Sequence, residues 1–114
     1  MTDLLDKKCV PCEGGVRPFD ISEIHKYQKK VDGWNIIKNI NDVYFLEKNF
    51  KFINFKESQD FVNNVGKISE EEGHHPDIYF GWGYAKINIT THAFEGLSEN
   101  DFILAAKIDK IINA

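Results

Sequence analysis

The chain from residue 56 to residue 91 reads KESQDFVNNVGKISEEEGHHPDIYFGWGYAKINITT, and this stretch decides the fold. In its first half, apolar residues such as Phe61 and Val65 recur at helical spacing, with charged and amide side chains on the opposite face. Gly73 follows the last charged residue, and glycine is the residue that most often ends a helix. The first half therefore predicts an amphipathic helix from Lys56 to Glu72.

The second half of this stretch changes to the two-residue period of β-strands. Residues 78–82 are short, aromatic and bounded by glycines. In residues 84–91, Ala85, Ile87 and Ile89 alternate with polar side chains. Such alternation is typical of a strand with one buried face. We therefore expect two consecutive antiparallel strands directly after the helix.

The segment before this stretch predicts one more helix and one more pair of strands. Ser22 is a suitable N-cap for a helix that runs to about Val31 and ends at Gly33. Between Trp34 and Phe55, aromatic and β-branched residues alternate with polar ones. The turn-like sequence Asn39-Ile40-Asn41-Asp42 divides this part into two strands.

Near the end of the chain, Ser98 can cap a terminal helix. The whole order predicts an α+β fold of two layers, in which helices pack on one face of a four-stranded antiparallel sheet. Residues 21–114 form one domain in this prediction. Residues 1–20, with two prolines and the pair Gly14-Gly15, form an irregular arm before it. Because such a sheet has two open edges, we expect a homo-oligomer, either a dimer or a tetramer.

Length and charge argue against several classes of protein. A chain of 114 residues fits one domain with a core of its own. The net charge is -4 and Arg17 is the only arginine, which argues against a nucleic-acid surface. No apolar run is long enough to span a bilayer, and the N-terminus lacks the basic and apolar segments of a signal peptide. We therefore expect a cytoplasmic protein that binds neither nucleic acid nor membrane.

Both cysteines lie in the sequence Cys9-Val10-Pro11-Cys12. This spacing suits half of a zinc site or a redox pair, yet zinc usually needs four ligands and the chain has no second cysteine pair. A reduced cysteine pair in a structural loop is the alternative. We expect no metal at this position.

Three of the four histidines, His74, His75 and His92, lie within one short part of the chain. Histidine is the side chain that titrates near neutral pH, so a group of histidines beside a carboxylate can supply both an acid and a base. Glu70 lies one helical turn before His74, where its carboxylate can orient that imidazole. The remaining histidine, His25, lies in the first predicted helix.

Other interpretations of these residues stay open at this point. The imidazoles of His74 and His75 can interact with the C-terminal end of the helix dipole. Together with His92 they form three candidate ligands for a zinc ion with an open position for water, as in a zinc hydrolase. Asp101 is also suited to the first turn of the last helix, where a carboxylate interacts favourably with the helix dipole.

The joint spacing of Glu70, His74-His75-Pro76, Trp82, His92 and Asp101 resembles the signature of the pterin-4a-carbinolamine dehydratase family. The resemblance extends over nearly the whole chain, and the cysteine-containing arm is most similar to bacterial and plant members. The further similar segments are residues 9–15, 33–34, 52–55 and 96–109.

The resemblance implies a reaction and a set of roles. Members remove water from a 4a-hydroxytetrahydropterin without cofactor or metal, after aromatic amino-acid hydroxylases have formed this compound from tetrahydrobiopterin. By position, His74 and His92 resemble the general acid and base, and His75 resembles a residue that positions the substrate. Glu70 resembles the carboxylate that orients the histidines, and Asp101 the acidic residue that supports His92 or the pocket wall.

Two more residues are candidates for pterin binding. Trp82 is an aromatic residue able to line a pterin cleft, although a place in the core is equally compatible with it. Animal members often carry tryptophan two residues after the proline of the histidine motif, where this chain has Ile78. Animal members also act as dimerisation cofactors of a homeodomain transcription factor, so a protein-binding function without required catalysis is the alternative.

Overall fold

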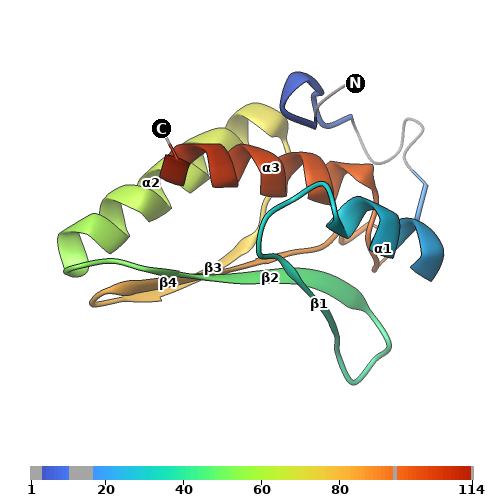
Figure 1. Cartoon of the computed structure of the whole chain (residues 1–114), viewed down its shortest axis with the longest axis horizontal. Coiled ribbons are helices and arrows are strands. Elements are labelled where there is room, and N and C mark those ends of the chain that lie inside the picture. Colours follow the sequence, from blue (N-terminus) through green and yellow to red (C-terminus); the bar gives the residue numbers. More distant parts are fainter. Residues whose placement is uncertain (1–3, 11–16, 94, 114) are drawn as a thin grey trace.

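The computed structural model describes residues 4–10, 17–93 and 95–113. Helices lie on one side of a twisted sheet (Figure 1), as the sequence predicts. A short 3-10 turn, η1 (Leu4–Asp6), comes first, and the main elements are α1 (Ile21–Gln28), β1 (Asn35–Lys38), β2 (Tyr44–Lys51), α2 (Phe55–Glu72), β3 (Asp77–Gly81), β4 (Tyr84–Ile89) and α3 (Glu99–Asn113).

The four strands form one sheet in the order β1-β2-β4-β3, and each neighbouring pair is antiparallel. Leu46 of β2 lies opposite Ile89 of β4, and Ile87 of β4 lies opposite Ile78 of the edge strand β3. Ala85, Ile87 and Ile89 are fully buried beneath the helices, because alternate residues of β4 face the same side. The prediction of an α+β fold with a four-stranded antiparallel sheet is confirmed.

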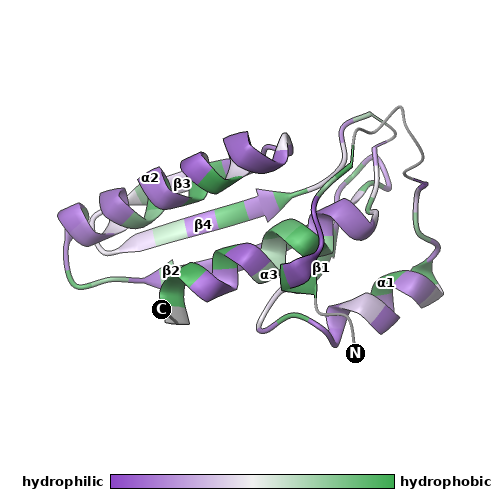
Figure 2. Cartoon of the chain, turned by 90° about the horizontal axis from the view of Figure 1, so that it is seen from above, coloured by the Kyte–Doolittle hydropathy of each residue, from purple (hydrophilic) through white to green (hydrophobic). Residues whose placement is uncertain are grey.

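The helical layer consists mainly of α2 and α3, which run side by side over the sheet in both views (Figures 1 and 2). Hydrophobic and hydrophilic residues alternate along α2, whereas the middle of α3 is predominantly hydrophobic (Figure 2). In α3 the residues Phe102, Ile103, Leu104 and Ala105 are all buried. The terminal helix is therefore the centre of the hydrophobic core.

The N-cap of the first helix lies two residues before the predicted cap, Ser22. Asp20 is the N-cap, because its carboxylate accepts the N–H of Glu23 at 2.8 Å and Glu23 accepts the N–H of Asp20 in return. The helix ends at Gln28 rather than near Val31. The side-chain amide of Gln28 donates to the carbonyl of Trp34, which accompanies the turn of the chain toward the sheet.

The end of α2 lies where the sequence predicts it. Gly73 has a φ of 64°, in the left-handed region that favours glycine. The N–H of His74 donates to the carbonyl of Ser69 at 3.2 Å, and the N–H of Gly73 donates to Glu70. These two bonds form the Schellman arrangement. The backbone of His74 therefore satisfies the helix end, and its imidazole is left for other contacts.

Part of the predicted N-terminal arm packs on α3. Leu4 and Cys9 are buried there, and η1 is the one helical turn among residues 4–10 and 17–20 of the arm. Cys12 and the pair Gly14-Gly15 lie outside the described residues, so their predicted part in an irregular arm stays a prediction.

One charged side chain lies on the helix-facing side of the sheet, where the alternation of β2 suggests an apolar residue. Lys48 donates to Asp109 of α3 at 2.8 Å and to the carbonyl of Asp32. The indole N–H of Trp34 lies 3.1 Å from each oxygen of the Asp109 carboxylate. This group joins the middle of β2 to α3.

Candidate active site

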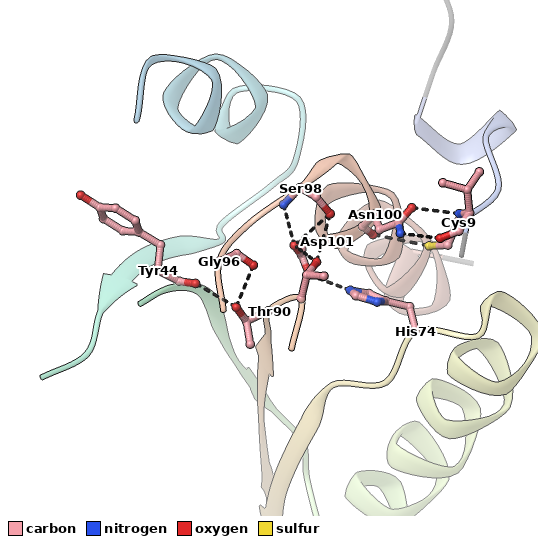
Figure 3. Close-up of polar contacts among 10 residues, drawn as sticks. Cys9, Tyr44, His74, Thr90, Gly96, Ser98, Asn100 and Asp101 are labelled. Carbon is pink, nitrogen blue, oxygen red and sulfur yellow. Dashed lines mark hydrogen bonds and ion pairs between the residues drawn. The ribbon is translucent and has the colours of Figure 1, made fainter. Parts of the chain in front are cut away.

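The site begins with a pair of buried side chains, His74 and Asp101. Nε2 of His74 lies 2.7 Å from Oδ1 of Asp101, and Figure 3 shows the imidazole pointing from the end of α2 into the first turn of α3. Asp101 is fully buried and His74 is 6% exposed. A buried carboxylate at this distance orients the ring and favours a proton on Nε2.

The other oxygen of Asp101 is also fully used. It accepts the hydroxyl of Thr91 and the backbone N–H of Ser98, each at 2.8 Å. The bond from the N–H of Ser98 is the one that the acidic residue of a capping box accepts. Asp101 therefore stabilises the start of α3 and orients His74 at the same time. The family resemblance implies that Asp101 supports His92 or the pocket wall, whereas its imidazole partner here is His74.

The carboxylate of Glu70 pairs with His75, not with His74 as helical spacing suggested. Nε2 of His75 is hydrogen-bonded to Oε2 of Glu70, and both side chains are exposed. The difference has a physical cause. Gly73 turns the backbone out of the helix, so the i, i+4 relationship does not extend to His74.

His92 lies on a tight loop that follows β4. Thr91 and Gly96 exchange backbone hydrogen bonds of 2.8 and 3.3 Å across the loop. The hydroxyl of Thr90 lies 2.9 Å from the carbonyl of Tyr44 and 3.0 Å from that of Gly96, as Figure 3 shows. These bonds close the loop and attach it to β2, while the side chain of His92 remains exposed.

A cavity of about 300 Å³ lies beside His92. Because Thr91 turns inward to Asp101, strand alternation places Thr90 and His92 on the sheet face that the helices leave open. The pair of Asp77 and Asn88 continues the cavity along the sheet. The wall is completed by the β1–β2 turn, and the lining residues are Asn39, Asn41, Val43, Phe45, Asp77, Asn88, Thr90, His92 and Glu95.

The three histidines thus gather at one end of the sheet, but not around one point. His74 lies on the helix side of the sheet with Asp101. His92 lies in the cavity on the open side, and neither His74 nor His75 is among the residues that line it. His75 is exposed and directly precedes Pro76 and the cavity residue Asp77.

The two predicted pterin-binding residues lie elsewhere in the chain. Trp82 is in the β3–β4 turn and is 71% exposed. It is separated from the histidine end by the whole of β3, whose five residues span about 16 Å. Ile78 lies opposite Ile87 on the helix-facing side of the sheet and is half-buried. Within one chain, therefore, neither side chain joins His92 at the cavity.

The zinc interpretation finds no ligand set in the described part of the chain. Across residues 4–10, 17–93 and 95–113, no group of three or more His, Cys, Asp or Glu is arranged to hold a metal ion. Burial, together with the charge of Glu72, raises the pKa of the Cys9 thiol to about 12, so it stays protonated at neutral pH. Nor is any helix in these ranges long and apolar enough to cross a membrane.

Several site residues escape the sequence interpretation. Thr91 binds Asp101, and Asp77 and Asn88 line the cavity. For Thr91 a signal exists, because the alternation of β4 places it on the buried face. The contribution of Asn39 and Asn41 depends on how the β1–β2 turn packs beside the loop of His92, which no local pattern specifies.

Comparison with known proteins identifies many relatives. A protein of Rubrobacter xylanophilus is 46% identical over 111 residues, which cover 97% of this chain and 100% of the relative. A protein of Halorhodospira halophila is 47% identical over 108 residues, or 95% of this chain and 96% of the relative. Both carry the provisional name pterin-4-alpha-carbinolamine dehydratase.

Two solved structures are similar in fold. A Brucella melitensis protein described as a transcriptional coactivator/pterin dehydratase has a TM-score of 0.75 and 24% identity, with 83% of this chain and 98% of that chain covered. A pterin dehydratase-like protein described as a RuBisCO assembly factor of the alpha-carboxysome has a TM-score of 0.61 and 25% identity, with 72% and 92% covered. The family model for pterin 4 alpha carbinolamine dehydratase matches residues 17–111, and the chain belongs to this family.

Proposed function

We propose that this protein is a 4a-hydroxytetrahydrobiopterin dehydratase, which removes water from the pterin 4a-carbinolamine and releases quinonoid dihydropterin. One observation carries the proposal. A chain of this family holds His74 against a buried carboxylate and presents His92 to a cavity at the same end of the sheet. The product would serve the recycling of tetrahydrobiopterin after an aromatic amino-acid hydroxylase has formed the substrate.

The reaction needs two proton transfers and no redox step. The bond between C4a and the hydroxyl oxygen breaks, and a proton delivered to that oxygen lets it leave as water. A proton is removed from N5, and the electron pair of the N5–H bond forms the new double bond between N5 and C4a. Two imidazoles in different protonation states can supply both transfers near neutral pH.

The surroundings of the two histidines favour a division of roles. Asp101 accepts a hydrogen bond from Nε2 of His74, which leaves Nδ1 as the nitrogen that can take a proton. We therefore assign the base to His74. His92 is exposed at the cavity and is suited to protonate the leaving hydroxyl.

The cavity provides groups that match a pterin. Phe45 and Val43 offer apolar surface for the flat ring, whose polar edge can meet carboxylate and amide groups such as Asp77 and Asn88. Because His74 does not line the cavity, the ring would have to extend beyond it toward the end of α2 to meet the proposed base. Its volume of about 300 Å³ lies at the lower end of small-molecule sites. His75, paired with Glu70 beside this face, would position the substrate. Trp82 and Ile78 would contribute to a pterin site only through an adjoining subunit.

The test compares three single substitutions. In His74→Gln and His92→Gln, the rate of carbinolamine dehydration should fall about 10²- to 10⁴-fold, the usual contribution of a positioned acid or base. His25→Gln is the matched control, because His25 is exposed on α1. Stopped-flow absorbance of quinonoid dihydropterin gives the rate. Turnover in both site variants equal to that of His25→Gln would refute the proposal.

Protein binding is a second candidate function. Large apolar side chains are exposed around the β3–β4 turn and the start of α2, far from the histidines. We test first whether a second copy of this chain covers them, in a dimer or a tetramer. The open sheet edges at β1 and β3 favour such a homo-oligomer. Light scattering should show smaller particles for Ile53→Ser than for the native protein. The exposed residues are Ile53, Phe55, Tyr79, Phe80, Trp82 and Tyr84.

A further inference from the structure

Residues 4–10 of the N-terminal arm contact the two chain segments that carry His74 and Asp101. Leu4 packs into the core, and Cys9 is buried between α2 and α3. Figure 3 shows Cys9 and Asn100 together at the first turn of α3, next to the pair of Asp101 and His74. The arm thus lies directly behind the proposed base and its carboxylate.

On α3 the arm is held by Asn100, the residue before Asp101. The backbone N–H of Val10 donates to Oδ1 of Asn100 at 3.1 Å, and Nδ2 of Asn100 donates to the carbonyl of Val10 at 2.8 Å. The thiol of Cys9 lies 3.5 Å from the backbone carbonyl of Asn100. Asn100 is only 2% exposed, so these bonds replace water on a buried amide.

On α2 the arm is held by Glu72, two residues before His74. The backbone N–H of Cys9 donates to Oε1 of Glu72 at 2.8 Å, and Lys107 of α3 donates to Oε2 at 2.7 Å. Burial acts to raise the pKa of Glu72, but the hydrogen bonds from Lys107 and Cys9 outweigh it, and the pKa lies below its usual value. Glu72 is therefore an anion that joins the end of α2 to both the arm and α3.

We propose that the arm is a positioning element of the active site: it clamps the end of α2 to the start of α3 and thereby maintains the hydrogen bond between His74 and Asp101. The clamp acts through Asn100 and Glu72, which are positioning residues and touch no substrate. The expected effect of the clamp on the dehydration rate rests on the proposed function. The expected effect of the clamp on the hydrogen bond of the His74 imidazole is independent of any substrate.

The places of the two anchors in the sequence support a positioning role over simple packing. Asn100 and Asp101 are consecutive, as are Glu72, Gly73 and His74, so a shift at either anchor moves a member of the pair. Loss of the arm would also leave the buried amide of Asn100 without its two partners from Val10. Misplacement of a reacting group by about 1 Å can lower a rate by about 10²-fold.

The test removes one backbone donor from the arm. Val10→Pro lacks the N–H that donates to Asn100, whereas Val10→Ala keeps it and changes only a side chain that is 48% exposed. The ¹⁵N spectrum of the His74 ring, assigned with His74→Gln, reports the share of the Nε2–H form in the protein without substrate. Dehydration kinetics report kcat and KM separately.

Val10→Pro should reduce the Nε2–H form of His74 and lower kcat by roughly 10-fold or more with little change in KM. Val10→Ala should match the native protein. Circular dichroism checks folding, and Asn100→Ala replaces Val10→Pro if the latter does not fold. An unchanged His74 spectrum and kcat in the folded variant would overturn the clamp. If the native protein shows no dehydration, the proposed function fails, while the spectra still decide on the clamp.

Discussion

Nε2 of His74 lies 2.7 Å from the fully buried carboxylate of Asp101, and this contact joins the end of α2 to the start of α3. Asp101 also binds Thr91, the residue before His92. One carboxylate therefore links the chain segments that carry both proposed proton carriers.

Asp101→Asn should lower kcat strongly. The expected loss approaches the roughly 10²- to 10⁴-fold in rate that a positioned acid or base contributes. An amide keeps the shape but has one acceptor oxygen, so it cannot serve both His74 and the donors Thr91 and Ser98. We also expect the free energy of unfolding to fall by about 1 to 3 kcal/mol. The control is Asp109→Asn, which alters another mostly buried carboxylate that binds Trp34. An equal loss of kcat in both variants would mean that destabilisation alone is responsible.

Gly73→Ala should lower the free energy of unfolding by about 1 kcal/mol, as measured by urea denaturation. A Cβ at residue 73 would meet no atom within 4 Å, so the cost comes from the φ of 64° and not from a clash. Gly66→Ala is the matched control within the same helix. It also has open space but lies in the helix interior, so it should stabilise by about 0.5 to 1 kcal/mol. Equal effects of the two changes would contradict this account of the helix end.

Lys48→Met should destabilise the protein by about 2 to 3 kcal/mol. The charge of Asp109, whose side chain is 11% exposed, would lose its cationic partner and keep only hydrogen bonds such as those from Trp34. Lys56→Met removes an exposed ion pair with Asp60 and should change stability by less than about 0.5 kcal/mol. Thermal or urea unfolding of the two variants makes the comparison. Similar small effects would show that the Lys48 pair contributes little.

Cys9 should react very slowly with iodoacetamide at pH 8. Burial and the charge of Glu72 raise the pKa of Cys9 from 9.0 to about 12, so its thiolate fraction is about 10³-fold lower than in the unfolded chain. The rate should rise as pH increases toward 12 or when urea unfolds the protein. Mass spectrometry on a Cys12→Ser background measures Cys9 alone. Labelling at pH 8 that is as fast in the native protein as in urea would disprove the burial effect.

The same shift has a consequence for stability. Below pH 9 the thiol is protonated in both states, so its contribution to the free energy of unfolding is constant. As pH rises from 9 toward 12, the unfolded chain loses the proton first, and the protein loses stability. Any acid whose pKa is higher in the folded state lowers the free energy of unfolding in this way as pH rises.

The sequence by itself determined the order of elements and the end of α2. The periodicity of residues 56–91 specifies a helix and two strands, because the spacing of apolar residues follows the geometry of each element. Gly73 marks the helix end, since it is suited to the left-handed backbone conformation found there. The motif residues also predicted family membership, which the family model and the relatives confirm. For α1 the prediction of Ser22 as the cap is wrong, although the capping box of Asp20 and Glu23 is a local signal in the sequence.

Only the tertiary structure decided which carboxylate meets which histidine. Helical spacing assigned Glu70 to His74, yet Glu70 pairs with His75 and Asp101 pairs with His74. These partners come from different elements, 27 residues apart in the case of His74 and Asp101, and their contact depends on how α2 and α3 pack. Local periodicity carries no information on such packing. The contact arises because α2 and α3 pack side by side on one face of the sheet.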